Sequence, residues 1–575
     1  MIYRVCLAAM LILMLTACTK TDPSSEHSDS MREESAKGLT RSQSAPGIDA
    51  SRLSSIVKVL ASDEFEGRAP GTPGETKTIT YLTEQFASMG LEPAGDNGGW
   101  TQAVPLIHTQ IEAPAAIALT VSGQSVTLLQ ERDVEVSTVR AVNSVSLKQA
   151  PVVFVGYGAS APERQWDDFG DIDLTGKVAL FLVNDPDFAA EPDEEVAGRF
   201  GNRRMTYYGR WMYKFEEAAR RGAAAALVIH ESTAAGYGWN VASSSPGENY
   251  AIPVQEGSTK PVALQGWMHG EVAANLFRQA GLDLQGQMKL ARQPDFQAFE
   301  MNGVSLSADF TVSMHKIVSQ NVLAKLPGTT RPDETIMLSS HWDAYGIGKP
   351  DAIGRTVRPG ANDDALGTAG VMEIARVLKA QDPLERSVVF AVWTAEESGL
   401  LGSAAYAANP LYPVEKTVAN LTLDILQTAG LARDVILVGE GQSDLEDDLA
   451  RAAKRQGRTI TPESLPENGL FFRADHFSMA RAGVPVLLLM GIAGGSDLID
   501  GGRDAGDQWI KDYIGTCYHQ TCDAWSADWD LAGAVQDIEL FLTITQELGN
   551  STRWPQWKPE SEFKAIRDTS DDVRK

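Results

Sequence analysis

The chain has 575 residues, enough for several domains at about 100–200 residues per domain. Hydrophobic residues make up 43% of it and charged residues 22%, proportions typical of a globular protein with a substantial core. The formal net charge is -26. A surface this acidic repels phosphate backbones, so we expect no nucleic-acid partner and interpret the charge as a solvated surface.

The N-terminus predicts an export signal. Arg4 precedes an apolar run over 5–15, which is long enough for a signal peptide but too short to span a bilayer. The run ends in LTAC, which resembles a bacterial lipobox and would make Cys18 the acylated first residue, with an ordinary cleaved signal as the alternative. We therefore expect a protein of the bacterial cell envelope, either an outer-membrane lipoprotein facing the periplasm, touching the membrane only through this lipid, or a secreted protein.

Four cysteines are present, and two of them remain for a disulfide. Cys6 leaves with the signal peptide, and Cys18 takes the lipid. In an oxidising compartment Cys517 and Cys522 would pair in a small loop that contains His519, with two free thiols as the alternative.

The segment 19–47 is polar and predicts a flexible tether, because its composition offers too little apolar surface to order it. A helical pattern follows from 48, then a Gly/Pro-rich loop that opens a helix through 86, and a strand over 100–107. The segment 112–305 contains the strand-like runs PVVFVGYG and GKVALFLVND and the helix–strand pattern KFEEAARRGAAAALVIH. It holds no metal-ligand-like cluster, so we interpret it as an inserted, non-catalytic domain.

Strands and helices alternate again from 312. TIMLSS, SVVFAVW, VANLTLD, DVILVG and VPVLLLMG predict strands, and TAGVMEIARVLKA predicts one of the helices between them. Such alternation predicts a mostly parallel sheet covered on both faces, an α/β fold of three layers. A last helix is expected over 530–548, followed by a polar, loosely ordered tail at 551–575.

Acidic and imidazole side chains follow these predicted strands. His341 comes after TIMLSS, Glu396 and Glu397 come after SVVFAVWTA, and Asp424 ends VANLTLD. In open α/β sheets, sites form at the carboxyl ends of the strands. Two further candidates are Asp363, in PGANDDALG before a helix, and His519, in CYHQTCD. Two imidazoles and several carboxylates in one cleft are what two zinc ions per chain require.

Neighbouring carboxylates have supporting roles in this interpretation. Asp343 could orient His341, because a zinc-bound imidazole usually donates its other N–H to a carboxylate or carbonyl. Asp364 could cap the helix that starts near Leu366. Glu396 and Glu397 are adjacent, so they cannot point the same way from an extended strand end, and one can bind metal while the other faces the reacting water.

These motifs resemble metallopeptidase family twenty-eight, which includes bacterial leucine-type aminopeptidases. The resemblance covers 49–111 and 312–549, with the ligands in the family order, and 112–305 resembles a protease-associated domain. It implies a three-layer catalytic domain with a mixed, mostly parallel sheet, plus a β-rich insert. The expected boundaries are a signal peptide at 1–17, a tether at 18–47, a catalytic domain at 48–111 and 312–550, an insert at 112–311 and the tail at 551–575.

The resemblance also implies a role for each site residue. His341 and Asp424 would bind one zinc, Glu397 and His519 the other, and Asp363 would bridge both. Glu396 would be the general base, and Tyr518 would donate to the oxyanion. The Asp363–Asp364 peptide is often cis in the family. The segment that lines the family's cleft corresponds to Arg473, Asp475 and His476, with Ala474 in place of a serine.

The expected activity is that of a zinc aminopeptidase acting on peptides. A metal-bridging hydroxide, formed with Glu396 as base, would attack the peptide carbonyl. The alternatives are a carboxypeptidase, for which Arg473 could bind the substrate carboxylate, a glutaminyl cyclase with a single zinc, and an inactive binding protein that resembles the transferrin receptor. The sequence predicts no particular oligomeric state.

Overall fold

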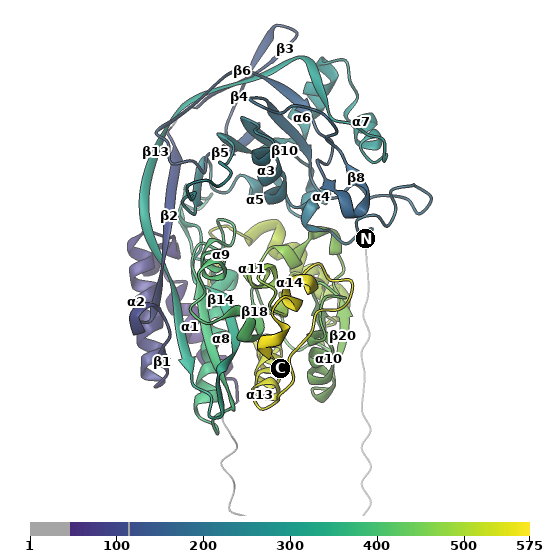
Figure 1. Ribbon diagram of the computed structural model, residues 1–575. Coiled ribbons are helices and arrows are strands. Elements are labelled where there is room, and N and C mark those ends of the chain that lie inside the picture. Colours follow the sequence, from purple (N-terminus) through teal and green to yellow (C-terminus); the bar gives the residue numbers. More distant parts are fainter. Residues whose placement is uncertain (1–46, 113–114, 575) are drawn as a thin grey trace, which may run out of the picture. The chain divides into compact units, whose positions relative to one another are not determined.

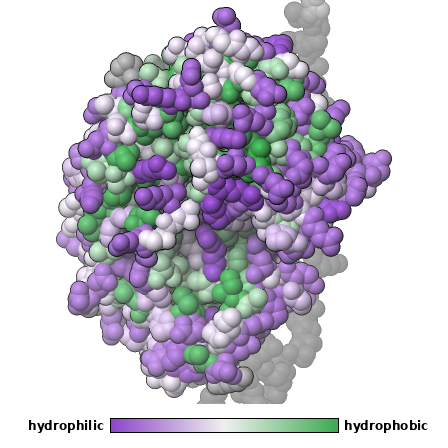
Figure 2. Space-filling model, turned by 45° about the horizontal axis from the view of Figure 1, so that its top comes forward, coloured by the Kyte–Doolittle hydropathy of each residue, from purple (hydrophilic) through white to green (hydrophobic). Residues whose placement is uncertain are grey.

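The computed structural model describes residues 47–112 and 115–574. The predicted signal peptide, Cys18 and all of the predicted tether except Gly47 lie outside the described residues. In the described ranges, no helix combines the length and the apolar character needed to cross a bilayer. The face seen in Figure 2 carries mainly hydrophilic side chains with small hydrophobic patches between them, in keeping with the acidic composition.

A five-strand segment of the large sheet forms the centre of the fold. Its order is β21 (Val486–Leu489), β18 (Thr417–Leu423), β14 (Arg331–His341), β17 (Arg386–Trp393) and β13 (Phe299–Leu326). All neighbours in this order are parallel except β13 and β17. The predicted α/β fold with a mixed, mostly parallel sheet is confirmed.

Both faces of this sheet are covered by helices (Figure 1). Every residue of β17 is buried, which explains the apolar run from Val388 to Trp393. Val388, Phe390 and Val392 share a hydrophobic cluster with α1 (Ala50–Leu60), α8 (Leu366–Lys379) and α13 (Ala532–Gly549). The alternate residues Val389, Ala391 and Trp393 share another with α9 (Leu401–Ala408) and α11 (His476–Arg481). The three layers follow from this alternation.

One very long strand joins the two predicted domains. β13 pairs antiparallel with β2 (Thr101–Ile111), from Thr101 opposite Val322 to Ile111 opposite Val312, and continues into the upper part of Figure 1. The predicted boundaries at 111/112 and 311/312 therefore fall side by side on a paired two-stranded ribbon, and no flexible linker separates the two parts on the β13 side. The assignment of 112–311 to a protease-associated domain stays a prediction.

The part of the chain between these boundaries has a sheet with helices on both faces. Its strand order is β6 (Ser144–Phe154), β9 (Val178–Leu182), β10 (Ala225–His230), β12 (Leu264–His269) and β5 (Val134–Ser137). Helix α6 (Gly270–Gln279) packs with one face through Phe277, and α3 (Trp211–Arg220) packs with the other through Phe215. The predicted helix–strand pattern is present here as α3 and β10.

The C-terminal tail is packed, so our expectation of a loosely ordered segment is wrong. Trp557 and Phe563 are each only 3% exposed. Arg567 lies in a short helix, α14 (Lys564–Asp568), and donates hydrogen bonds to the carbonyl oxygens of Val414 and Thr417. Although the tail is mostly polar, it contains a few aromatic residues, and the burial of their side chains orders the segment.

We predict that Trp557→Ala destabilises the protein by about 3–5 kcal/mol, the usual cost of removing a buried tryptophan side chain. The substitution also removes the hydrogen bond from the indole Nε1 to the Gly483 carbonyl. Thermal and urea unfolding would measure the change, with Ile566→Ala, at a position 44% exposed, as the control. Equal unfolding midpoints for both variants would contradict a packed tail.

Candidate metal centre

The carboxyl ends of three parallel strands carry the predicted ligands. His341 is the last residue of β14, Asp424 directly follows β18, and Glu396 and Glu397 lie in the turn after β17. Asp363 lies in an irregular turn, Ala361–Ala365, just before α8. Because parallel strands end at the same edge of the sheet, residues far apart in the sequence meet there.

These side chains form two groups of ligand atoms that share Asp363. The first group is His341, Asp363 and Asp424, and the second is Asp363, Glu397 and His519. His341 Nε2 lies 3.2 Å from Asp363 Oδ1. On the other side, His519 Nε2 lies 3.3 Å from Asp363 Oδ2 and 3.2 Å from Glu397 Oε2. Each oxygen of Asp363 thus faces a different group.

The donor atoms fit zinc. A tetrahedral zinc with bonds of about 2.0–2.1 Å places neighbouring ligand atoms about 3.3–3.4 Å apart, close to the separations found here. Asp424 Oδ1 is buried and has no hydrogen-bond partner among the described residues. Burial and the nearby Asp363 raise the pKa of Asp424 to about 7. Burial, followed by Asp363, also raises the pKa of Glu397 well above its usual range. A cation would keep these carboxylates ionised.

The Glu396 carboxylate belongs to neither group. It accepts no hydrogen bond from the described residues, and its nearest ionic neighbour is His341, with Nε2 3.9 Å from Glu396 Oε2. Burial raises the pKa of Glu396 well above its usual range, although His341 opposes part of that rise. The Glu396 carboxylate therefore lies beside the two groups of ligand atoms, and no described residue donates a hydrogen bond to it.

Asp343 holds the turn that carries the two glutamates. Its Oδ1 accepts a hydrogen bond from the backbone N–H of Glu396 (3.0 Å), and its Oδ2 accepts one from that of Glu397 (3.4 Å). The backbone carbonyl of Asp343 lies 3.1 Å from His341 Nδ1, which leaves Nε2 to face the metal position. Asp343 thus orients His341 through its main chain and the glutamates through its carboxylate.

Asp364 ties the same region to the start of α8. Its Oδ1 accepts from the Gly367 N–H (2.9 Å), and its Oδ2 accepts from the His341 N–H (3.2 Å). The expected helix-capping contact is thus present, together with a second contact to a predicted ligand. The Asp363–Asp364 peptide bond is cis, as the family resemblance implies.

Three residues at or next to the predicted ligands have left-handed backbone conformations. Ala395 has φ of 50°, Ile425 has φ of 53° and His519 has φ of 62°. This region is unfavourable for residues other than glycine, and such residues cluster where a fold must aim side chains into a site. Here they lie directly before Glu396, directly after Asp424 and at His519 itself.

Two positioning residues escaped the sequence analysis. Arg68 is fully buried and donates hydrogen bonds to the carbonyl oxygens of Trp342, Pro359 and Gly360, which flank two ligand loops. Asp523 accepts hydrogen bonds from the backbone N–H groups of Asn362 (3.0 Å) and Asp363 (3.1 Å). Its place in CYHQTCD, close to His519, was the only sequence signal for this role.

The remaining predicted residues divide into two sets. Tyr518 and Arg473 line the cavity, and Arg473 Nη2 donates to the Tyr518 hydroxyl (3.2 Å). Asp475 and His476 are buried and do not line it, which corrects their expected place in the cleft. His476 packs against the Phe471 ring, and burial lowers the pKa of its imidazole to about 3.

Cys517 and Cys522 form a disulfide beside Tyr518 and His519.

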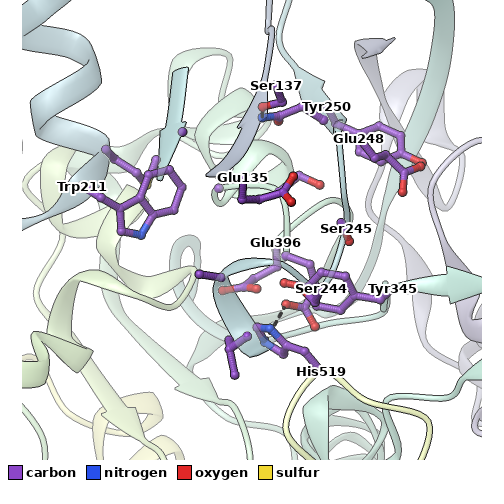
Figure 3. A pocket seen from close by; sticks show the side chains of 18 of the residues that line it. Glu135, Ser137, Trp211, Ser244, Ser245, Glu248, Tyr250, Tyr345, Glu396 and His519 are labelled. Atoms are coloured by element: carbon purple, nitrogen blue, oxygen red, sulfur yellow. Dashed lines mark hydrogen bonds and ion pairs between the residues drawn. The ribbon is translucent and has the colours of Figure 1, made fainter. Parts of the chain in front are cut away.

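A cavity of about 240 Å³ lies over the glutamates and is also lined by the inserted segment. Figure 3 shows Glu396, Tyr345 and His519 on one side of it and Glu135, Ser137 and Tyr250 on the other. The Tyr345 ring packs on His519, with 4.4 Å between the ring centroids. The inserted segment thus supplies part of the cavity wall.

We expect Asp523→Asn to weaken zinc binding by about 10- to 100-fold, since carboxylates that orient ligands typically have effects of this size. An amide offers only one acceptor oxygen to the two N–H groups that Asp523 now binds. Competition with a chromophoric zinc chelator would measure the affinity. Asp528→Asn, at an exposed position, is the matched control, and unchanged affinity in Asp523→Asn would contradict the positioning role.

Comparisons with known proteins find peptidase sequences similar to this chain. Residues 321–543 match the model of peptidase family M28. Aminopeptidase YwaD of Bacillus subtilis is 29% identical over 171 residues, which cover 29% of this chain and 34% of the relative. An aminopeptidase of Pseudomonas aeruginosa is 24% identical over 500 residues, covering 84% of this chain and 77% of the relative.

Among solved structures, an aminopeptidase from Aneurinibacillus sp. strain AM-1 aligns over 89% of this chain and 95% of its own, with 19% identity and a TM-score of 0.49. The chain spans 34% or less of the length of the first curated relatives it matches. The segment 321–543, which matches the family model of peptidase M28, contains all five predicted metal ligands.

Proposed function

We propose that the protein is a two-zinc exopeptidase that removes N-terminal residues from peptides. The observation that carries the proposal is the pair of ligand groups that share Asp363, beside a glutamate, Glu396, that belongs to neither. The family match and the relatives that are called aminopeptidases support the same activity.

Each zinc would have its own set of protein ligands. His341 and Asp424 would hold one ion, Glu397 and His519 the other, and Asp363 would bind both through its two oxygens. A pair of bound zinc ions polarises a carbonyl group and lowers the pKa of water, which makes hydrolysis possible near neutral pH.

Glu396 would be the proton carrier. Its carboxylate lies in the cavity wall and accepts no competing hydrogen bond from the described part of the chain, so it can take a proton from the attacking water and return it to the leaving amine. The backbone N–H of Glu396 is held by Asp343, which keeps the carboxylate in place during both transfers.

Tyr518 would stabilise the oxyanion. Its hydroxyl oxygen already accepts from Arg473, so its own proton remains available to a developing negative charge. Burial, partly opposed by Arg473, raises the pKa of Tyr518 well above its usual range, so the hydroxyl stays protonated. Preorganised donors of this kind act most strongly where charge develops in the transition state.

A carboxypeptidase on the same site is the second candidate, because Arg473 lines the cavity and is cationic. Acetylating the substrate's amino group distinguishes the two activities. An aminopeptidase loses its substrate on acetylation, whereas a carboxypeptidase still cleaves an acetylated peptide that has a free carboxylate.

Glu396→Gln should lower kcat on leucine p-nitroanilide by about 100- to 10,000-fold, the range for loss of a general acid–base group. Its zinc content should stay at the wild-type value, because Glu396 is not a predicted ligand. Steady-state kinetics with metal analysis by mass spectrometry would test both points. Glu84→Gln, at an exposed position on α2 (Pro73–Ser88), is the control. Unchanged kcat in Glu396→Gln would contradict its role.

Metal removal should lower both activity and stability. A metal that binds only the folded state stabilises it, and here it would also neutralise several buried carboxylates. Thermal unfolding of chelator-treated protein, repeated during zinc titration, should show a midpoint that rises with added zinc while hydrolysis returns. An unfolding midpoint that does not respond to zinc would contradict a zinc centre.

A further inference from the structure

Arg210 carries a buried guanidinium group that has no acidic partner within residues 47–112 and 115–574. It directly precedes α3 in the inserted segment, lines the cavity, and is only 6% exposed. Its Nε is buried without a hydrogen-bond partner, and no described residue forms a hydrogen bond or ion pair with any nitrogen of its guanidinium group. The guanidinium group lies over the Trp211 ring, with 6.0 Å between its central carbon and the ring centroid.

A second arginine faces the same cavity from the catalytic domain. Arg473 lies over the Tyr237 ring at 5.1 Å from its centroid and donates to Tyr518, but it too forms no ion pair with a described carboxylate. Burial and the positive charge of Arg473 lower the pKa of Arg210 to about 10, so Arg210 stays charged near neutral pH. Two like charges therefore share one wall of the cavity.

Two buried positive charges in one cavity are unfavourable unless an anion binds to them. A buried charge needs a partner, and unpaired ones are rarely kept in folded proteins. The acidic residues of the cavity do not fill this role, although Glu135, Glu396 and Glu397 line the same space. The planar guanidinium, with several N–H donors in a fixed fork, matches a carboxylate better than other groups.

We propose that Arg210 and Arg473 form a carboxylate-binding subsite, so that the enzyme selects peptides with a carboxylate near the cleaved bond. The inference rests on the proposed peptidase function and deepens it by naming the substrate class. The carboxylate can come from an acidic side chain or from the free C-terminus of a short peptide. Because Arg210 belongs to the inserted segment, this segment helps to determine which peptides the enzyme selects.

Two substrate pairs test the subsite in the zinc-loaded full chain. Leucyl-alanine with its amide measures the effect of a terminal carboxylate, and glutamyl p-nitroanilide with its glutaminyl counterpart measures that of a side chain. Arg210→Gln should lower kcat/KM for the charged member of one pair on the order of 10- to 100-fold, the effect of losing a charge-assisted hydrogen bond. The neutral member should change little, and the affected pair identifies the source of the carboxylate.

Two further variants separate this role from a structural one. Arg278→Gln, at an exposed position on α6, removes the same charge and should leave both ratios unchanged. Arg210→Lys keeps the charge without the fork, so its loss of selectivity should be smaller. Arg210→Gln should unfold at no lower temperature than wild type, because it removes an unpaired buried charge; if it fails to fold, the ratios of Arg210→Lys decide.

The proposed subsite would be wrong if Arg210→Gln changed kcat/KM equally for the charged and the neutral member of each pair, or changed it for neither member. Failure of the proposed function has a different signature, namely wild-type protein that hydrolyses none of the four substrates. Calorimetric binding of leucyl-alanine and its amide to wild type and Arg210→Gln would then test the subsite. Wild type should prefer the free carboxylate and Arg210→Gln should not; equal binding of both peptides to wild type would overturn it.

Discussion

Electrostatic repulsion among buried carboxylates is the constraint on which the site depends. Asp363, Asp424 and Glu396 are each less than 10% exposed and lie close to Glu397 at the same edge of the sheet. Such a group cannot ionise fully in a low-dielectric environment unless positive charge is present. In the function we propose, two zinc ions held by the two groups that share Asp363 would supply that charge.

The surrounding structure holds this unfavourable arrangement in place. The parallel strands bring His341, Glu396 and Asp424 to one edge, and the left-handed residues next to them turn the side chains inward. Arg68 and Asp523 then bind the backbone of the loops themselves. Because these contacts involve main-chain groups, they fix the path of the loops that carry the ligands.

Much of the fold and site was predictable from the sequence, because the signals were local. Apolar runs marked the strands, and each predicted ligand on the sheet follows one of them. The long strand β13 was not predictable as one element, since it passes from one part of the fold into the other. Arg68 and Arg210 were missed because their roles arise only from what surrounds them in space, which no sequence pattern records.

Anomalous diffraction from crystals of the zinc-loaded protein, recorded at the zinc absorption edge, tests the two-zinc centre most directly. We expect two strong peaks per chain, one next to His341 and Asp424, the other next to Glu397 and His519, with Asp363 between them. A single peak, or peaks away from these residues, would contradict a two-zinc centre and the mechanism built on it.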